Sequence, residues 1–553
     1  MAEITQRHPK GLYVLFTTEM WERFNFYGMR TLLTLFMAEA LMMGQKDSSL
    51  VYGGFLGLCY LTPMLGGYIS DKYLGNRNCI LLGGLLMGIG QLLLFTSASI
   101  FGNSIDLAKM VLWGALAVLI FGNGFFKPNI SSMVGQLYPK EQKNKLDSAF
   151  TIFYLGINVG ATLGQTICPL LGDHKYDGIR DNHAFRWGFL AASMAMFTAC
   201  IVFYFLKDKY VVTPEGKAIG AKPDKTITHH EGEAAHAKFT TKAVLTSSVI
   251  LIGLVFVFLN VFHQNLIYSI IYSSGLTLAG LILTDQSLTK IERDRIIVLY
   301  IVSFFVIFFW AAFEQAGSSL TFIADKQTDT HILGWEMPPS MVQNFNGIFV
   351  ILFAFPFSIL WMALSKRNKE PISPVKQAIG LGLIALGYFI IATQVKSLGL
   401  DGKLGVIWLI VLYLLHTWGE LCLSPIGLSL VSKLAPVRFA SLLMGVFFLS
   451  NASGYALAGT LGSLLPPSPD KYVVAQTAGI DLKGILDKTV TPNEEQIKFL
   501  TDSKIAIDYP SFVGFEIHDL YDFFMLFVIL PGIAALLLFS ISPILKKMMH
   551  GVR

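Results

Sequence analysis

The sequence predicts an all-α polytopic membrane protein, and three observations support this fold class. Hydrophobic residues make up 53% of the 553 residues and only 14% are charged, compared with about 25% in an average soluble domain. The apolar residues lie in long blocks, and a helix needs about 20 such residues to cross about 30 Å of hydrocarbon. Short polar segments separate these blocks along the chain. Together the three observations exclude a water-soluble globular protein.

We expect about 14 transmembrane helices. The predicted spans are about 12–42, 50–70, 79–99, 109–137, 146–170, 186–206, 243–263, 266–285, 295–325, 341–364, 374–395, 403–433, 438–465 and 521–545. An even number places both termini on one side of the membrane. Lys and Arg in the short loops favour that side roughly three to one, which marks it as cytoplasmic. We therefore predict a multi-pass protein of the cell (inner) membrane with cytoplasmic termini.

The spacing of the spans divides the chain into three parts. We expect an N-terminal six-helix bundle over 1–206 and a C-terminal six-helix bundle over 295–553. Between them, 207–294 comprises a basic linker and a tight transmembrane helical hairpin that turns near Gln264. Paired six-helix bundles are the layout of transporters that hold their substrate near the bilayer midplane.

Two polar segments stand apart from the spans. The linker contains His229, His230 and His236; a metal role is an alternative, but a solvated flexible strap is favoured. The extracellular or periplasmic loop at about 466–520 is polar, and Pro492 followed by Asn493 and Glu494 predicts the start of a short helix. The sequence does not indicate what this loop does.

Composition also limits the chemistry. The five cysteines all fall inside apolar blocks without a CxxC or Cys/His spacing, so we expect buried thiols and neither disulfides nor a metal site. The formal net charge of +5 is spread over loops, and we expect no nucleic-acid partner.

The first span carries charges where charges are costly. Glu19, Glu22, Arg23 and Arg30, together with Phe26, lie within an arc of about 100° on a helix. A charge at a membrane-helix centre costs about 2.5–3.5 kcal/mol on insertion scales. A Glu19–Arg23 pair that only holds helices together is one interpretation, but it leaves Glu22 and Arg30 unexplained. We therefore predict that this face lines a water-filled cavity.

Further polar residues recur at similar depth in other spans. Lys127 precedes Pro128, which suggests a bent helix that delivers an ammonium group into a cavity, although a snorkelling Lys is the alternative. The other such residues are Tyr154, Asn158 and Gln165; Trp310 and Glu314; Gln343, Asn344 and Asn346; and Tyr413, His416, Thr417, Glu420 and Ser424. Singly these side chains often join helices. Together they predict one polar cavity shared by both halves.

The charges in this cavity suggest both a coupling ion and a substrate class. The carboxylates are Glu19, Glu22, Glu314 and Glu420, and the cations are Arg23, Arg30 and Lys127. One negative charge is in excess, and a buried carboxylate without a full partner readily takes up a proton. We hypothesise that protons are the coupling ion, with no other cofactor. A cavity with both signs of charge also suits a zwitterion such as a short peptide.

Six segments closely resemble the proton-dependent oligopeptide transporter family of the major facilitator superfamily. EMWERFNFYG is similar to the family's ExxERFxYYG. GNGFFKPNIS, FYLGINVG, FWAAFEQAGSSL and GELCLSPIGLSLVSKLAP also match the family, and GGYISDKYLGNR resembles the superfamily's cytoplasmic loop signature. The resemblance implies a major facilitator fold with two six-helix bundles, and the extra hairpin at about 243–285 is a feature of bacterial members.

The resemblance also implies roles for single residues. Proton coupling would use Glu19, Glu22, Arg23 and Glu314. The peptide carboxylate would bind Arg23 and Lys127, the peptide ammonium would bind Glu420, Asn158 and Asn346, and the side-chain pockets would be lined by Tyr27, Tyr60, Tyr154, Trp310, Ser424 and Phe447. Alternating access would use two gating salt bridges, Arg30–Glu314 and Lys127–Glu420.

Three positions depart from the family pattern. Phe26 replaces the first Tyr of YYG, Phe447 stands where many members have Trp, and Gly53 lies near the position of a His in animal members. These departures bear on specificity and on the proton route rather than on the class.

The function that follows is proton-coupled import of di- and tripeptides by a monomeric or weakly oligomeric protein in membrane lipid. A carrier of nitrate, an amino acid or a drug in the same superfamily is the nearest alternative. A receptor that does not transport is a second, and an intramembrane enzyme is a third. The enzyme is disfavoured because the chain contains no HExxH, GxGD or suitably placed GxSxG motif.

Overall fold

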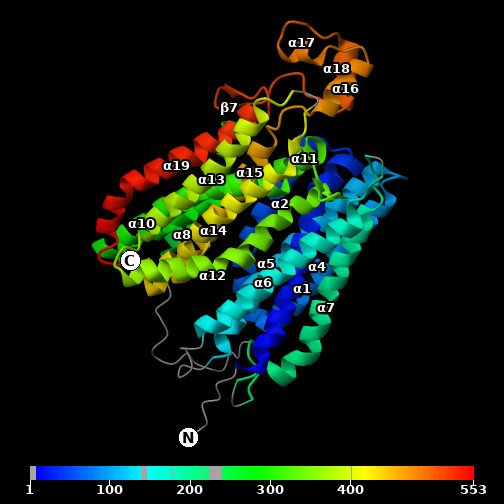
Figure 1. Ribbon diagram of the computed structural model, residues 1–553. Coiled ribbons are helices and arrows are strands. Elements are labelled where there is room, and N and C mark those ends of the chain that lie inside the picture. Colours follow the sequence, from blue (N-terminus) through cyan, green and yellow to red (C-terminus); the bar gives the residue numbers. More distant parts are fainter. Residues whose placement is uncertain are drawn as a thin grey trace. The chain divides into compact units, whose positions relative to one another are not determined.

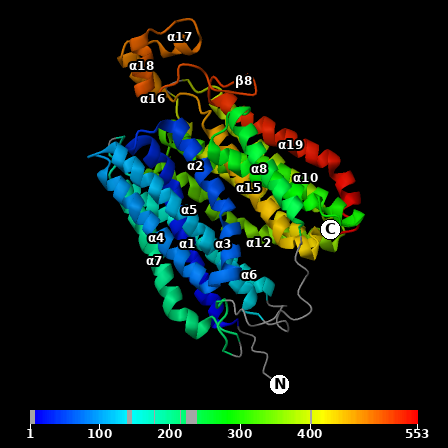
Figure 2. The ribbon, with the colours of Figure 1, turned by 180° about the vertical axis from the view of Figure 1, so that it is seen from behind.

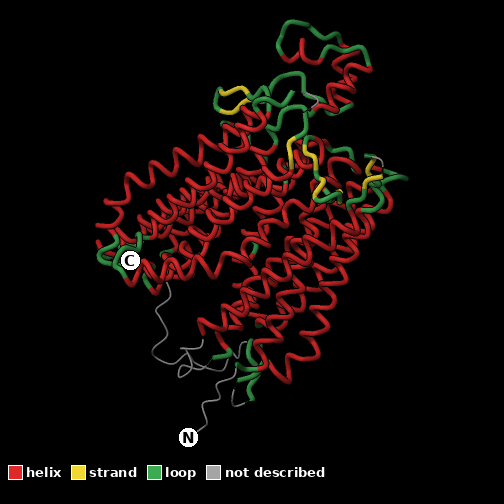
Figure 3. The backbone as a smooth tube through the Cα atoms, in the orientation of Figure 1, coloured by secondary structure: helices red, strands yellow, loops and turns green. Residues whose placement is uncertain are grey.

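The computed structural model is almost entirely helical (Figure 1). It describes residues 8–138, 146–176, 178–213, 216–222, 239–399 and 402–552. The described strands are two-residue pieces in the connections between helices (Figure 3). The predicted histidines of the linker, at positions 229, 230 and 236, lie outside the described residues. By packing, the chain divides into two units.

Unit 1 comprises Met1–Phe36 and Leu58–Ala235. Its elements are α1 (Lys10–Leu35), α3 (Pro63–Ile69), η2 (Ser70–Leu74), α4 (Asn76–Ile100), α5 (Ile105–Gln136), α6 (Leu146–Gly172), the antiparallel pair β1 (Lys175–Tyr176) and β2 (Ile179–Arg180), and α7 (Phe185–Tyr210). α1 packs against α6 and α7, and α4 packs against α5 and α7. The helix α1, which carries Glu19, Glu22, Arg23 and Arg30, is therefore central to this unit.

Small residues let α1 and α6 approach closely. A methyl group added at Gly160 would collide with the backbone of Met20, and one at Gly164 would collide with the backbone of Phe24. Both contacts lie level with the charged stretch of α1. The glycines of α6 therefore fix the depth and rotation at which α1 presents that stretch.

The helix α2 (Gly44–Leu61) belongs to both units. Residues up to Gly57 pack with unit 2, together with η1 (Phe36–Ala40), and residues from Leu58 pack with unit 1. Division by packing thus differs from the predicted boundaries over Met37–Gly57. At Gly53 the added methyl group would meet Gly459 and the carbonyl of Tyr455, so this helix crossing requires glycine.

Unit 2 comprises Met37–Gly57 and His236–Arg553. Its transmembrane elements are α8 (Thr241–Asn260), α9 (Leu266–Leu283), α10 (Lys290–Phe313), η4 (Glu314–Gly317), α11 (Ser319–Lys326), η5 (Pro339–Gln343), α12 (Asn344–Lys366), α13 (Ser373–Val395), α14 (Val406–Leu434), η6 (Val437–Phe439), α15 (Ala440–Gly462) and α19 (Leu520–Met548). α13 packs against α14 and α19, and α10 packs against α15.

The inserted hairpin is formed by α8 and α9, as the sequence predicts. α9 packs against α15, and the Tyr268 hydroxyl donates a hydrogen bond to the Leu50 carbonyl of α2 at 2.9 Å. α8 packs on α9 and none of its residues is buried; it lies on the face turned toward the viewer in Figure 2. The hairpin therefore adds one helix to the packed unit and one outer helix.

Short strands connect the helices of unit 2 on one side. β3 (Thr328–Asp329) pairs in parallel with β6 (Leu404–Gly405). β4 (His331–Ile332) pairs with β5 (Trp335–Glu336), and β7 (Ser511–Phe512) pairs with β8 (Phe515–Glu516), both antiparallel.

Every predicted span coincides with a helix. Within the described residues, 12 helices or runs of adjoining helices are long and apolar enough to cross a membrane. α1 and α6 have 26 and 27 residues, but the charges of α1 and the Asn, Gln and Gly of α6 make them less apolar. Some spans are less regular than expected. The predicted helix 50–70 is interrupted at Thr62, between α2 and α3, and the predicted helix 295–325 is broken by the 3-10 turn η4 at Glu314.

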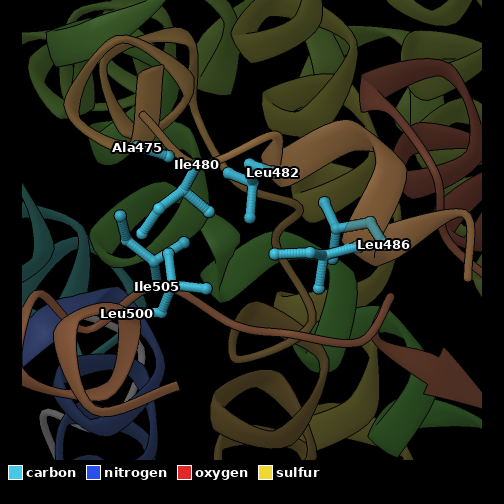
Figure 4. Packing of buried hydrophobic residues seen from close by; sticks show 7 residues of the cluster. Ala475, Ile480, Leu482, Leu486, Leu500 and Ile505 are labelled. Atoms are coloured by element: carbon cyan, nitrogen blue, oxygen red, sulfur yellow. The ribbon is translucent and has the colours of Figure 1, made fainter. Parts of the chain in front are cut away.

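The loop predicted at about 466–520 is a small folded element. It contains α16 (Pro469–Thr477), α17 (Leu482–Leu486) and α18 (Glu494–Asp502). α18 begins where predicted, because Asn493 caps it and forms a capping box with Gln496. The element has its own buried apolar cluster (Figure 4), formed by Ala475, Ile480, Leu482, Ile485, Leu486, Leu500 and Ile505.

Candidate functional site

The charged stretch of α1 forms a compact cluster inside unit 1. Glu19, Glu22 and Arg23 are all buried. The Arg23 Nε lies 2.8 Å from Glu19 Oε1 and 2.5 Å from Glu22 Oε2. One guanidinium therefore serves two carboxylates, and the simple Glu19–Arg23 pair accounts for only half of the cluster.

Hydrogen bonding in this cluster is incomplete. Although the ion-pair distances are short, the Arg23 Nε–H is not aligned with either carboxylate, and neither Glu22 oxygen has a hydrogen-bond partner among the described residues. A buried carboxylate in this situation is costly. The cluster has an excess negative charge, and a proton on Glu22 would remove it and supply a donor.

Lys127 adds a second cation to the same unit. Its ammonium group lies 3.8 Å from the centre of the Tyr60 ring, a cation–π contact, and its charge acts on Glu22. α5 continues through Pro128, which cannot bond to the Gly124 carbonyl. α3 packs against that carbonyl at Gly66, where no side chain would fit. The proline thus marks the place where α3 and α5 touch beside Lys127.

The remaining predicted residues of unit 1 lie on α1 and α6. Arg30 is buried, with its guanidinium 5.1 Å from the centre of the Tyr27 ring. On α6, the Asn158 side chain donates to the Tyr154 carbonyl at 2.9 Å. Tyr154 is exposed and Asn158 is half-buried, as expected for side chains that line an open space, but their substrate contacts stay predictions.

In unit 2, Glu314 lies at the break between α10 and η4. Its carboxylate is buried and accepts a hydrogen bond from the Tyr52 hydroxyl at 3.5 Å. Tyr52 packs directly against Gly317, where an added methyl group would collide with it. Tyr52 is not among the site residues predicted from the sequence. The only signal in the sequence was a tyrosine directly before Gly53 and Gly54 in a predicted span.

A second polar cluster joins α12 and α14. The Asn346 Nδ2 donates to Glu420 Oε2 at 2.9 Å and to Thr417 Oγ1 at 3.0 Å. Thr417 in turn donates to the Tyr413 carbonyl at 2.8 Å. The predicted grouping of Asn346, Thr417 and Glu420 is therefore present, and Ser424 is half-buried one turn further along α14.

Aromatic residues pack beside these polar groups. The Trp310 ring centre lies 5.2 Å from that of Phe313 and 5.7 Å from that of Tyr455. Phe447 is buried, and a methyl group added at Gly427 would collide with its ring. The substitution of Phe at this position therefore fits a tightly packed α14–α15 contact.

The predicted site residues thus form two sets. Unit 1 brings Glu19, Glu22, Arg23, Tyr60 and Lys127 together, and unit 2 brings Asn346 and Glu420 together and places Glu314 against Tyr52. The gating pairs Arg30–Glu314 and Lys127–Glu420 join residues of different units and stay predictions. Among the described residues no cluster of His, Cys, Asp and Glu could hold a metal ion.

Comparison with known proteins agrees with this architecture. The chain is 33% identical to the peptide transporter YePEPT of Yersinia enterocolitica subsp. palearctica over 468 residues, which cover 82% of this chain and 88% of that protein. It is 28% identical to a di-/tripeptide transporter of Lactococcus lactis subsp. cremoris, over 86% of this chain and 93% of that one.

Solved structures are similar along the whole chain. A POT family transporter in complex with a thioalcohol conjugated peptide superimposes with a TM-score of 0.72 at 26% identity, covering 98% of both chains. A POT family transporter in complex with 5-aminolevulinic acid gives a TM-score of 0.71 at 26% identity, again covering 98% of both chains. These relatives are transporters and not enzymes. Because the POT family profile matches residues 77–476, this chain belongs to the POT family of membrane transporters.

Proposed function

We propose that this protein is a proton-coupled symporter that imports di- and tripeptides by alternating access. Named relatives carry peptides, and a structural relative binds a conjugated peptide. The observation that carries the proton coupling is the α1 cluster, in which two buried carboxylates share the guanidinium of Arg23. A proton on Glu22 would remove one of these two negative charges and weaken its hold on Arg23.

The substrate contacts are proposed from the charges in the two units. Lys127 and, once Glu22 is protonated, Arg23 would bind the peptide carboxylate, since ionised donors form the stronger hydrogen bonds. Glu420, held by Asn346, would bind the peptide ammonium. Protonation of Glu22 and binding of the peptide carboxylate would both change the contacts of the Arg23 guanidinium. This shared group would couple the two events.

Uptake of labelled di- and tripeptides into proteoliposomes tests this proposal. An imposed proton gradient should drive accumulation, and its collapse should abolish accumulation but leave peptide exchange. Lys127→Ala should reduce uptake at low peptide concentration by about tenfold or more, because it removes a charged hydrogen-bond donor worth about 1.5–3 kcal/mol. Lys109→Ala, on the same helix α5, is the matched control and should transport normally.

The nearest alternative is separable in the same assay. A carrier of nitrate has no ammonium group to bind, so Glu420→Gln would leave its transport intact. Loss of peptide uptake in Glu420→Gln supports the peptide carrier. Accumulation driven equally well by a sodium gradient would reject proton coupling.

A further inference from the structure

Two hairpins of unit 2 share an unusual turn. β4 pairs with β5 across Leu333 and Gly334, and β7 pairs with β8 across Val513 and Gly514. Leu333 has a φ of 49° and Val513 a φ of 50°, and the glycines that follow have φ of 84° and 81°. Both turns are therefore two-residue connections with left-handed backbone at both positions, the geometry of a type I′ turn.

The residue types at the first turn position are unfavourable for this backbone. Asn, Asp or Gly normally fills it, whereas a bulky or β-branched side chain at positive φ is strained. In sequence, Asp177 and Gly178 lie between the paired strands β1 and β2 of unit 1. A hairpin in this chain thus does not require Leu or Val at its tip.

These same tips are fully exposed apolar groups. Leu333 is 104% exposed and Val513 is 92% exposed, and the aromatic residues that follow the glycines, Trp335 and Phe515, are 48% and 38% exposed. The strained side chains therefore contact almost nothing within the protein. Strain and exposed apolar surface at the same position indicate an external contact that the isolated chain does not supply.

Both hairpins lie at the ends of membrane spans on one side. Successive spans alternate in direction, which places the connection between α11 and α12 on the same side as that between α15 and α19, and the β3–β6 pairing joins two connections of that side. β5 ends at Glu336, just before η5 begins at Pro339, and β8 ends at Glu516, just before α19 begins at Leu520. In Figure 1, β7 lies beside the start of α19.

Chain length limits how far the hairpins stand from the bilayer. Three or four residues span at most about 10–14 Å. The headgroup region on each side of the hydrocarbon is about 5–8 Å thick. The membrane–water interface, where Trp and other amphipathic residues concentrate, therefore lies within reach of both hairpins. The exposed apolar face of α19, which includes Ile529, Ile533 and Leu536, continues into the bilayer from the second hairpin.

We propose that the two tips are interfacial anchors: Leu333 and Val513, each with its following aromatic residue, insert into the lipid headgroup layer on the side of the α16–α18 element. The neighbouring His331, Glu336 and Glu516 stay in the hydrated layer. The lipid buries the apolar surface that water would otherwise cover, and this offsets the backbone strain. The anchors fix the depth at which the broken helix α10–η4 and the start of α19 sit in the membrane.

Environment-sensitive labels at the tips test the proposal. Leu333→Cys and Val513→Cys are labelled with a nitrobenzoxadiazole dye in separate full-length proteins; the five native cysteines are all buried. Gln476→Cys, exposed on α16 in the same connection, is the matched control. The proteins are reconstituted into phosphatidylcholine vesicles with a spin label either at the headgroup or deep in the acyl chain.

We expect blue-shifted emission and at least twofold stronger quenching by the headgroup spin label at both tips than at position 476, with weaker quenching by the deep label. Water-like emission at the tips, equal to the control, would overturn the proposal. Blue-shifted emission without quenching by either lipid label would also overturn it, because the tips would then contact protein, such as a second copy of this chain.

A second variant excludes insertion caused by the dye itself. The label is moved to Trp335→Cys and quenching is compared with and without Leu333→Asn. Asn suits the left-handed position, so the hairpin is kept while the apolar tip is lost. We expect the quenching at position 335 to fall by about half in Leu333→Asn; unchanged quenching would contradict an anchoring role for Leu333.

Discussion

The two charged regions of this protein hold their carboxylates in opposite ways. On α1, Glu19 and Glu22 share one guanidinium and the Glu22 oxygens have no hydrogen-bond partner among the described residues. On α14, Glu420 is half-buried and accepts a hydrogen bond at 2.9 Å from the neutral amide of Asn346. The contacts of Glu19 and Glu22 with Arg23 are ionic, whereas the contact of Asn346 with Glu420 comes from a neutral donor.

This difference separates two functions that a symporter must combine. A buried carboxylate in a charge-rich, donor-poor cluster changes its protonation more readily than one that neutral donors hold in its ionised form. The α1 cluster is therefore suited to a proton. The Asn346–Glu420 pair is suited to keeping a carboxylate ionised and oriented toward an organic ammonium. Substitutions in the α1 cluster should impair proton-driven accumulation, whereas substitutions in the Asn346–Glu420 pair should weaken peptide binding and leave the proton coupling unchanged.

The largest effect is expected from Glu22→Gln. The neutral amide mimics the protonated state permanently, so gradient-driven peptide accumulation should be abolished while exchange at equal pH persists. Asp106→Asn makes the same change at an exposed carboxylate of α5 and should be neutral. Both are measured by uptake and counterflow in proteoliposomes. Normal gradient-driven accumulation in Glu22→Gln would remove the α1 cluster from proton coupling.

A smaller and different effect is expected from Asn346→Leu. The side chain has similar volume but cannot donate to Glu420, and losing a hydrogen bond to a charged group costs about 1.5–3 kcal/mol. Peptide KM should rise by about tenfold or more, with the pH dependence of transport unchanged. Asn260→Leu, on the outer helix α8, is the control. A shifted pH profile in Asn346→Leu, with KM unchanged, would reverse the roles assigned to the two regions.

Tyr52→Phe should have the smallest effect. Its hydroxyl donates to Glu314 over a long 3.5 Å, and a typical hydrogen bond contributes about 0.5–1.5 kcal/mol. Gradient-driven uptake should fall by about two- to tenfold without a change in the exchange KM. Tyr300→Phe removes the hydroxyl of a half-buried tyrosine that donates to the Ala279 carbonyl of unit 2 at 2.9 Å and serves as control. Equal losses in the two variants would mean that Tyr52 acts through packing alone.

The fold was predictable because its main signal is local. Each span is an apolar block, and even the short helix α18 starts at a recognisable cap, Asn493. The α1 stripe was predictable for the same reason, since helical periodicity brings Glu19, Glu22 and Arg23 to one face. The Asn346–Glu420 contact was anticipated only as a shared polar cavity, because its partners lie on helices far apart in sequence.

What could not be predicted depends on tertiary packing. The break at η4, which places Glu314 against Tyr52, follows Phe313 without a proline. Gly317 and Ser318 at its end are a weak local signal, because Ser453 and Gly454 lie within the regular helix α15. The division of α2 between the two units depends on the close approach of Gly53 to Gly459. Glycine in a span has many possible causes, so the sequence alone does not identify its neighbour.

The most direct test of the central claim, that the α1 cluster carries the proton, measures proton movement itself. Proteoliposomes containing a trapped pH-sensitive dye receive dipeptide without an imposed gradient. We predict that inward peptide flux acidifies the lumen in the wild-type protein and that Glu22→Gln moves peptide without acidification. Peptide entry without a pH change in the wild-type protein, or unchanged acidification in Glu22→Gln, would contradict it.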